Sequence, residues 1–175
     1  MRDYIETVSG KKVFLPDPDP DSIRIGDIAH ALSFMPRFAG HTNTFYSVAE
    51  HSINVASIVP PEHQLQALLH DATEAYLCDI PTPFKRMIPK YKELEGNLWA
   101  AISEKFGVPF ELSPEVKWAD RVMLMTERDA LKDRYGLWSD EYENTERVPF
   151  KRRDWDFDQC AQQFKRKFYD YGGKR

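Results

Sequence analysis

Apolar side chains recur three and four residues apart through most of this chain, the spacing that places them on one face of a helix. The pattern predicts five helices, at residues 47–59, 61–75, 91–107, 113–132 and 156–173. The first residues differ, because β-branched and aromatic side chains flank a Ser-Gly turn in YIETVSGKKVFL, residues 4–15. We therefore expect an all-α fold in which strands are confined to a small N-terminal β-hairpin.

Residues that favour helix ends support these boundaries. Ser47 and Glu50 have the spacing of a capping box at the start of the first predicted helix. Pro61 suits the first turn of a helix, because the N–H that proline lacks has no intrahelical hydrogen-bond partner there. Ser113, followed by Pro114, marks the start of another helix. Gly107 stands where a glycine stop is expected.

The length of the chain favours one domain. Its 175 residues, 42% of them hydrophobic, suffice for a single core, so we assign residues 1–175 to one domain. A proline-rich segment, LPDPDPDS at 15–22, separates the hairpin from the helices. We divide the domain into a hairpin and hinge (1–22), a helical core (23–132) and a tail with a C-terminal helix (133–175).

Charge and cysteine content exclude several classes of protein. A net charge of −4 with mixed signs argues against binding duplex nucleic acid or an anionic membrane, although a local patch can still hold a small phosphate. Cys78 and Cys160 are too far apart in sequence for a disulfide framework or a zinc cluster motif. The first residues are charged, and no window approaches the ~20 apolar residues of a membrane span. We expect a soluble cytoplasmic protein.

Ionisable residues interrupt the predicted apolar faces. His51 has helical spacing with aliphatic residues of its segment, and Asp120 lies on the apolar stripe of 113–132. In 61–75, three titratable residues share a second face: His70, Asp71 and Glu74. Burial of such groups is costly unless they are paired or bind a metal.

Two interpretations of these residues remain open at this point. Two imidazoles and two carboxylates make a mixed nitrogen and oxygen set that suits a divalent transition metal: His51, His70, Asp71 and Asp120. Alternatively, His51 is a hydrogen-bonded core residue and Asp120 forms a salt bridge with Arg121 or Arg128. The other histidines are interpreted as structural: His30, His41 and His63.

Three motifs carry a resemblance to a known superfamily. In chain order, they are YSVAEHS with a histidine, LLHDATEAY with a His-Asp pair and KWADRVML with an aspartate. This series resembles the H…HD…D signature of HD-domain metal-dependent phosphohydrolases. The stretch HDATEAYLCDIPTPFK, residues 70–85, is similar to bacterial 5'-deoxynucleotidases and phage dATP triphosphohydrolases. The resemblance covers residues 27–131 and implies an HD-domain helical bundle.

The resemblance also implies roles for individual residues. His51, His70, Asp71 and Asp120 match the metal ligands. Glu74 matches the catalytic glutamate, which would orient the attacking water and handle its proton.

The substrate side of the site follows from the same resemblance. Asp79 matches a further acidic residue at the substrate, and Arg37 a phosphate-binding arginine, whose guanidinium fork suits a phosphate. Lys85 is a candidate contact to the phosphate chain. Phe38 and Gly40 depart from the family pattern: Phe38 stands where the deoxynucleotidases have a tryptophan, and some triphosphohydrolases carry a bulky residue in place of Gly40. These departures leave the base and sugar preference open.

The function implied by the resemblance is metal-dependent hydrolysis of the 5'-phosphate ester of a nucleotide, in particular a 2'-deoxynucleotide. The enzyme would act as a dNTP triphosphohydrolase on a dATP-like substrate or as a 5'-deoxynucleotidase. Its metal would be Co, Mn, Zn, Fe or Ni, and a second ion, Mg, could bind together with a polyphosphate substrate. The resemblance implies a homo-oligomer. The alternative is a non-catalytic nucleotide-binding or assembly module with a structural metal, against which the presence of Glu74 argues.

Overall fold

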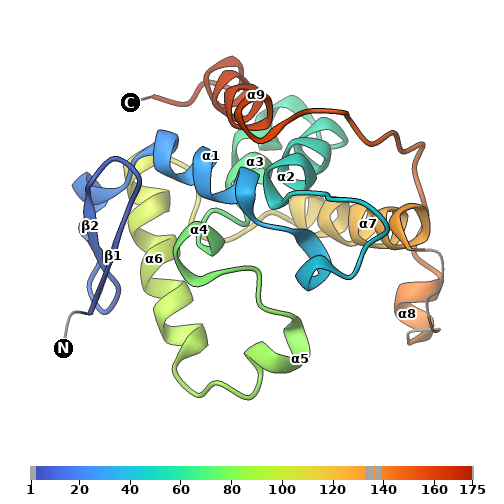
Figure 1. Cartoon of the computed structure of the whole chain (residues 1–175), viewed down its shortest axis with the longest axis horizontal. Coiled ribbons are helices and arrows are strands. Elements are labelled where there is room, and N and C mark those ends of the chain that lie inside the picture. The colour runs from blue at the N-terminus through green and yellow to red at the C-terminus, as the bar shows by residue number, and fades with distance from the viewer. Residues whose placement is uncertain (1–2, 133–135, 137–138, 175) are drawn as a thin grey trace.

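The protein is mostly helical, with one small hairpin (Figure 1). The computed structural model describes residues 3–132, 136 and 139–174. Strands β1 (Tyr4–Glu6) and β2 (Lys12–Phe14) pair antiparallel, with Ile5 opposite Val13. Gly10 takes a positive φ of 76° in the turn between them, a conformation that favours glycine. The predicted fold class, all-α with an N-terminal hairpin, is confirmed.

The Asp27 carboxylate links the hairpin to the first helix, α1 (Ile25–Phe34). The side chain of Asp27 accepts hydrogen bonds from the hydroxyls of Thr7 and Ser9, each at 2.7 Å, and from the Ser9 amide at 3.0 Å. Between hairpin and helix, the proline-rich segment forms one 3-10 turn, Pro20–Ser22, capped by the side chain of Asp19. The hinge is therefore an ordered connection.

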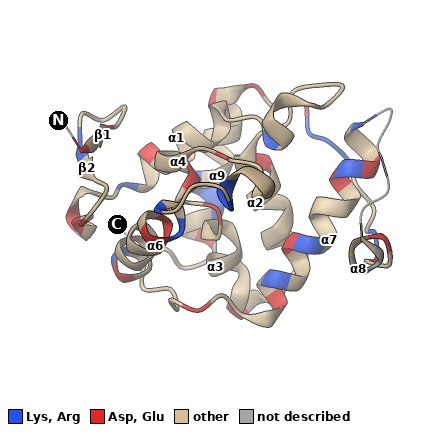
Figure 2. Ribbon diagram, turned by 90° about the horizontal axis from the view of Figure 1, so that it is seen from below, with Lys and Arg blue, Asp and Glu red and all other residues tan. Residues whose placement is uncertain are grey.

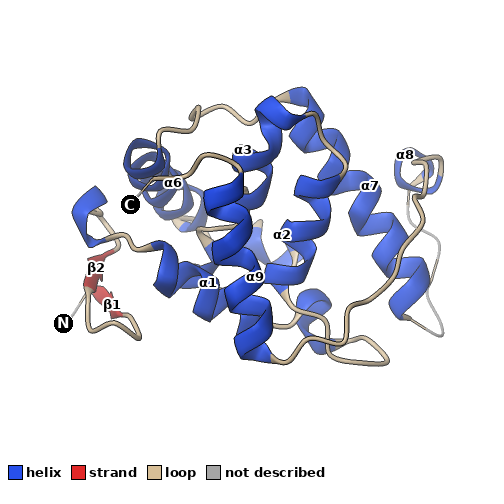
Figure 3. Ribbon diagram, turned by 90° about the horizontal axis from the view of Figure 1, so that it is seen from above, coloured by secondary structure: helices blue, strands red, loops and turns tan. Residues whose placement is uncertain are grey.

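Helices from both ends of the chain enclose one core. Figure 3 shows α9 (Phe157–Asp170) lying across α1 and α2 (Val48–Ser57). Its inward residues Cys160, Phe164 and Phe168 belong to the same buried cluster as the residues of α1 and α2. The segment assigned to the tail thus completes the core. Within the described part of the chain, no helix is both long and apolar enough to cross a membrane.

The remaining helices surround this core. α6 (Tyr91–Phe106) ends at Gly107, which adopts the left-handed conformation with φ 67°, as predicted. α7 (Pro114–Leu131) begins after Ser113, whose hydroxyl accepts from the Val116 amide. Figure 2 shows acidic and basic residues alternating along α7. The shorter helices are α4 (Glu74–Leu77), α5 (Thr82–Lys85) and α8 (Asp140–Glu143).

The predicted capping box at the start of α2 is half correct. The Ser47 hydroxyl accepts from the Glu50 amide at 3.1 Å, as expected. The Glu50 carboxylate, however, accepts from the Arg153 amide at 2.7 Å. The segment that leads into α9 passes over the start of α2, and it provides Glu50 with a donor that local sequence cannot reveal.

The helix predicted at 61–75 is interrupted. The chain forms a 3-10 turn at Pro61–His63, then α3 (Gln64–Leu69), and α4 begins only at Glu74. In the intervening turn, backbone bonds run from Ala72 N to Leu69 O and from Glu74 N to Asp71 O, the i→i−3 pattern of a tighter coil. The expectation of one continuous helix was wrong, and His70 and Asp71 lie in its tight turn.

Candidate functional site

Three separate segments bring the predicted ligand residues together. His51 lies in the middle of α2, Asp120 in the second turn of α7, and His70 and Asp71 in the turn between α3 and α4. α2 packs against both α3 and α7, and this packing brings residues far apart in sequence to one place.

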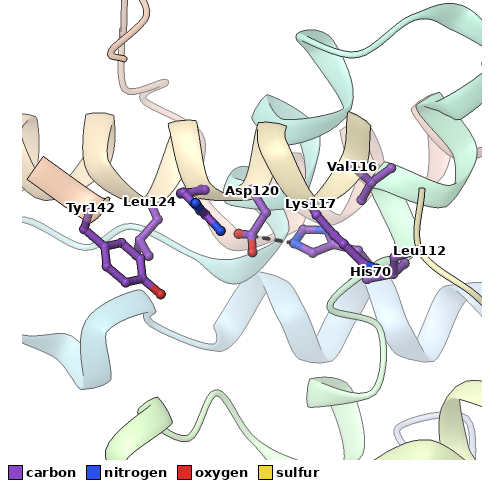
Figure 4. A pocket seen from close by; sticks show the side chains of 8 residues that line it. His70, Leu112, Val116, Lys117, Asp120, Leu124 and Tyr142 are labelled. Atoms are coloured by element: carbon purple, nitrogen blue, oxygen red, sulfur yellow. Dashed lines mark ion pairs between the residues drawn. The ribbon is translucent and has the colours of Figure 1, made fainter. Parts of the chain in front are cut away.

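The imidazoles face the carboxylates at short distances. His51 Nε2 lies 3.2 Å from Asp120 Oδ1 and 3.5 Å from Asp71 Oδ2. His70 Nε2 lies 3.3 Å from the same atom of Asp71 and 3.6 Å from that of Asp120, the latter contact dashed in Figure 4. One ligand atom each from His51, His70 and Asp120 lies within 4.8 Å of the other two, so these residues can hold a metal ion.

These contacts bear on the alternatives that the sequence left open. Asp120 contacts two imidazoles, while the Arg128 guanidinium pairs with Asp129 at 3.0 Å and Glu143 at 2.7 Å. Asp120 is therefore placed as part of a cluster of potential ligands.

The cluster strongly shifts proton affinities. Burial lowers the pKa of the His70 imidazole, but Asp71 and Asp120 outweigh it and raise this pKa to about 9. Desolvation alone would raise the pKa of Asp120, yet the adjacent imidazoles of His51 and His70 hold it well below the usual 3.8. Without a metal, the carboxylates thus favour protons on the imidazoles, and an ion that binds here must displace them.

Unsatisfied buried atoms show that the residues fit a metal. His70 Nε2 and Asp71 Oδ2 are buried and have no hydrogen-bond partner. His70 Nδ1 donates to the Ala67 carbonyl at 2.7 Å, so Nε2 is the nitrogen that faces the cluster and would bind an ion once its proton is displaced. Buried polar atoms without a hydrogen bond are costly, and a cation bound by both atoms would reduce that cost. The nitrogen and oxygen donors suit a divalent transition ion.

Glu74 borders the cluster in a buried position. Burial, reinforced by the charges of Asp71 and Asp79, raises the pKa of the Glu74 carboxyl well above 4.5. Glu74 Oε1 lies 3.3 Å from Lys85 Nζ, which also lies 3.1 Å from Glu95 Oε1. Lys85, expected at the phosphate chain, is thus placed between two carboxylates in this structure.

The Arg37 guanidinium contacts carboxylates of the cluster. Its Nη1 lies 3.6 Å from both Asp71 Oδ2 and Asp79 Oδ2. Burial lowers the pKa of Arg37, but surrounding carboxylates, Glu127 first, raise it above its usual value, so the guanidinium stays charged. The burial of Asp79 raises the pKa of that carboxyl.

The backbone beside Arg37 is strained. Phe38 and Ala39 have positive φ angles of 54° and 51°, which cost non-glycine residues roughly 1–3 kcal/mol each. The Phe38 ring centre lies 5.8 Å from the Arg37 guanidinium carbon and 4.7 Å from Lys132 Nζ. Strained residues of this kind concentrate at functional sites, and here the strain places an aromatic ring next to Arg37.

Two adjoining cavities border the cluster. The larger, about 600 Å³, is bordered by most predicted site residues: Arg37, Phe38, Asp71, Glu74, Asp79, Lys85 and Asp120. His41, interpreted as structural from the sequence, also lines it, as do Arg86 and Lys132. The smaller, about 170 Å³, lies beside His70, Asp120 and Lys117 (Figure 4). Asp120, Leu124 and Tyr142 line both.

Sequence reasoning did not include Glu127 among the candidate site residues. The sequence places it on the inward stripe of the 113–132 helix, seven residues after Asp120, and that position was the available signal. In the structure its carboxylate lies 2.8 Å from His51 Nδ1.

Comparison with known proteins identifies relatives but no activity. No family model matches the sequence. The chain is 50% identical over 125 residues to Uncharacterized protein YfdR of Escherichia coli (strain K12), a match that covers 71% of this chain and 70% of YfdR. It is 41% identical over 128 residues to Uncharacterized protein RCAP_rcc00048 of Rhodobacter capsulatus, covering 67% of this chain and 65% of the relative. At this level of identity and coverage, the chain belongs to the same protein family as YfdR.

Proposed function

We propose that this protein is an HD-type phosphohydrolase that hydrolyses the 5'-phosphate ester of a nucleotide with the aid of a divalent transition metal. The observation that carries the proposal is the convergence of four potential ligands: His51, His70, Asp71 and Asp120. Two of their buried atoms, His70 Nε2 and Asp71 Oδ2, lack a hydrogen-bond partner. A buried carboxylate and a buried guanidinium flank this cluster at a cavity, an arrangement suited to acid-base chemistry on a phosphate.

The four ligands would hold the ion, which when bound lowers the pKa of a coordinated water and polarises phosphate oxygens. Glu74 is the base in this proposal. Its burial and its acidic neighbours raise the proton affinity of the carboxyl, a property that suits a group accepting a proton from attacking water. Asp79 is a second acidic group within the same cavity.

Arg37 binds the phosphate in this proposal. Its guanidinium contacts the carboxylates of Asp71 and Asp79 at 3.6 Å, longer than an ideal ion pair, so a phosphate can compete for its N–H groups. A charge held beside the reacting phosphate stabilises the charge that develops there during transfer.

The larger cavity suits a nucleotide. A volume of about 600 Å³ lies within the roughly 300–1,000 Å³ of small-molecule sites. Its lining combines an aromatic ring, Phe38, with cationic side chains, Arg86 and Lys132, that can accommodate phosphates. The resemblance favours a 2'-deoxynucleotide, and we assign that preference to the ring of Phe38 beside Arg37, although the deoxynucleotidases have a tryptophan at this position.

A substrate panel tests the proposal. The metal-free protein is supplied in turn with Co²⁺, Mn²⁺, Zn²⁺, Fe²⁺ or Ni²⁺, with and without Mg²⁺, and offered mono-, di- and triphosphates of each ribo- and deoxynucleoside. Released phosphate, pyrophosphate and triphosphate are measured separately. Release of phosphate from monophosphates identifies a nucleotidase, and release of triphosphate identifies a triphosphohydrolase.

The control is Asp120→Asn, which removes a ligand charge from a side chain that is 44% exposed. We expect this variant to lose the activity of the parent. Nucleotide binding by the metal-loaded parent without any product would contradict the proposal and favour a non-catalytic binding module.

A further inference from the structure

Glu127 is a fully buried carboxylate that contacts His51, one of the proposed metal ligands. Its side chain has 0% relative exposure, and it projects from α7 two turns after Asp120. A buried carboxylate is costly unless donors surround it. Glu127 must therefore be explained by the groups that it contacts.

Two hydrogen-bonding groups and one cation surround Glu127. His51 Nδ1 lies 2.8 Å from Oε1 and 3.0 Å from Oε2, and the Tyr46 hydroxyl donates to Oε1 at 2.7 Å. The Asn54 amide in turn donates to the Tyr46 oxygen at 2.9 Å. On the other side, Arg37 Nε lies 3.8 Å from Oε2.

The contact with His51 decides which nitrogen faces the ligand cluster. A neutral imidazole carries one N–H, and a carboxylate against Nδ1 retains that proton there. The lone pair then lies on Nε2, the atom that is 3.2 Å from Asp120 and 3.5 Å from Asp71. A carboxylate behind a ligand histidine also increases the basicity of the ring.

We infer that Glu127 is a positioning residue that serves both halves of the site: it orients His51 toward the metal and holds Arg37 toward the phosphate. This inference rests on the proposed function. Arg37 Nε is buried and has no hydrogen-bond partner. The negative charge of Glu127, whose Oε2 lies 3.8 Å away, therefore stabilises the Nε end of the guanidinium. Metal binding and phosphate binding thus depend on one carboxylate.

Glu127→Gln tests the inference on metal binding alone. The substitution preserves size but removes the charge, so His51 loses a charged acceptor at Nδ1. We expect the dissociation constant for Co²⁺, measured by calorimetry on metal-free protein, to rise ~10- to 100-fold, the usual effect of losing such a partner. The visible absorption of the Co²⁺ complex should also change, because the geometry of His51 is altered.

The matched control is Glu50→Gln. Glu50 is also a buried glutamate, it lies on α2 next to His51, and its carboxylate accepts from the Arg153 amide. This variant should bind Co²⁺ like the parent. Equal Co²⁺ affinity in the parent and in Glu127→Gln would overturn the inference, whereas a parent that binds no metal would overturn the proposed function itself.

A second measurement examines the Arg37 half. Binding of inorganic phosphate to metal-free protein should weaken in Glu127→Gln and remain unchanged in Glu50→Gln. A loss of Co²⁺ affinity with unchanged phosphate binding would overturn the claim that Glu127 serves both halves.

Tyr46→Phe keeps the inference testable if Glu127→Gln does not fold. It removes one donor from Glu127 and leaves the carboxylate in place. We expect a smaller loss of Co²⁺ affinity, roughly two- to tenfold, in line with the loss of one hydrogen bond. An unchanged affinity together with an unchanged absorption spectrum would overturn the inference.

Discussion

Glu74 and Glu95 share one cation but lie in different surroundings. Lys85 Nζ is 3.3 Å from the first and 3.1 Å from the second. The Glu74 side chain is only 5% exposed and borders the cavity, whereas that of Glu95 is 34% exposed. Because both glutamates contact Lys85 and only Glu74 borders the cavity, Glu95 provides an internal control for the proposed catalytic role of Glu74.

Glu74→Gln should separate binding from chemistry. The amide keeps the size of the side chain but cannot accept a proton, so we expect metal and nucleotide binding to persist while turnover falls by ~10²-fold or more. Glu95→Gln, which also removes one charge from Lys85, should retain parental turnover. Parental turnover in Glu74→Gln would assign the proton to another group, and Asp79 would then be tested first.

Arg37 and Phe38 are adjacent in sequence, but we expect them to recognise different parts of the substrate. A guanidinium interacts with phosphate charge that all nucleotides share, so Arg37→Ala should reduce kcat/KM for all accepted nucleotides about equally. An aromatic wall discriminates by shape, so Phe38→Ala should change the ratio of kcat/KM for deoxy- and ribonucleotides, by an amount of ~1–3 kcal/mol. If all rates fall together in Phe38→Ala, the ring is a packing residue and the deoxynucleotide preference loses its local support.

At the scale of elements, α9 stabilises the fold without contributing any of the proposed site residues. The Asp156 carboxylate accepts from the Gln159 amide at 2.7 Å, and the Gln159 side chain accepts from the Asp156 amide at 3.1 Å. This complete capping box starts the helix that lies across α1 and α2.

Asp156→Ala should therefore cost stability while leaving metal affinity intact. Loss of an N-cap lowers the free energy of unfolding by about 0.5–2 kcal/mol. The control is Gln162→Ala, an exposed change inside α9, which should stay within about 0.5 kcal/mol of the parent. Denaturant melts measure both variants. A cap variant as stable as the control would show that tertiary packing alone sustains the start of α9.

At the scale of the whole molecule, the proposed ligands connect α2, α7 and the turn before α4. An ion held by all three would crosslink segments that are up to 69 residues apart in sequence. Because such an ion binds the folded chain preferentially, its binding energy adds to the free energy of unfolding.

Removal of the metal should lower the melting temperature as well as the activity. At a free metal concentration 100 times Kd, binding stabilises by about 2.7 kcal/mol, which corresponds to roughly 5–10 °C for a chain of this size. Scanning calorimetry with and without EDTA measures the shift. Asp120→Ala controls for other effects of the chelator, since its melting should not respond. Equal melting and activity of the parent with and without EDTA would contradict the site.

Most helix positions could be predicted because they depend on local chemistry. The apolar spacing in 91–107 and 113–132, the serine before Pro114 and the glycine at 107 each act within a few residues, and the structure confirms these elements. The interruption between α3 and α4 could not be predicted in this way. Its i→i−3 turn keeps the residue spacing close to that of a helix, so the apolar pattern in 61–75 hardly changes.

The spacing of apolar residues was enough to predict the all-α class with its N-terminal hairpin, and three motifs were enough to predict the candidate metal ligands. The distances between these residues, and the groups that surround Glu127, depend on the packing of separate helices. His51 and Glu127 are 76 residues apart, and their contact exists because α2 packs against α7. Spacing along one helix shows that Glu127 faces inward, but which buried groups meet it there depends on how separate helices pack.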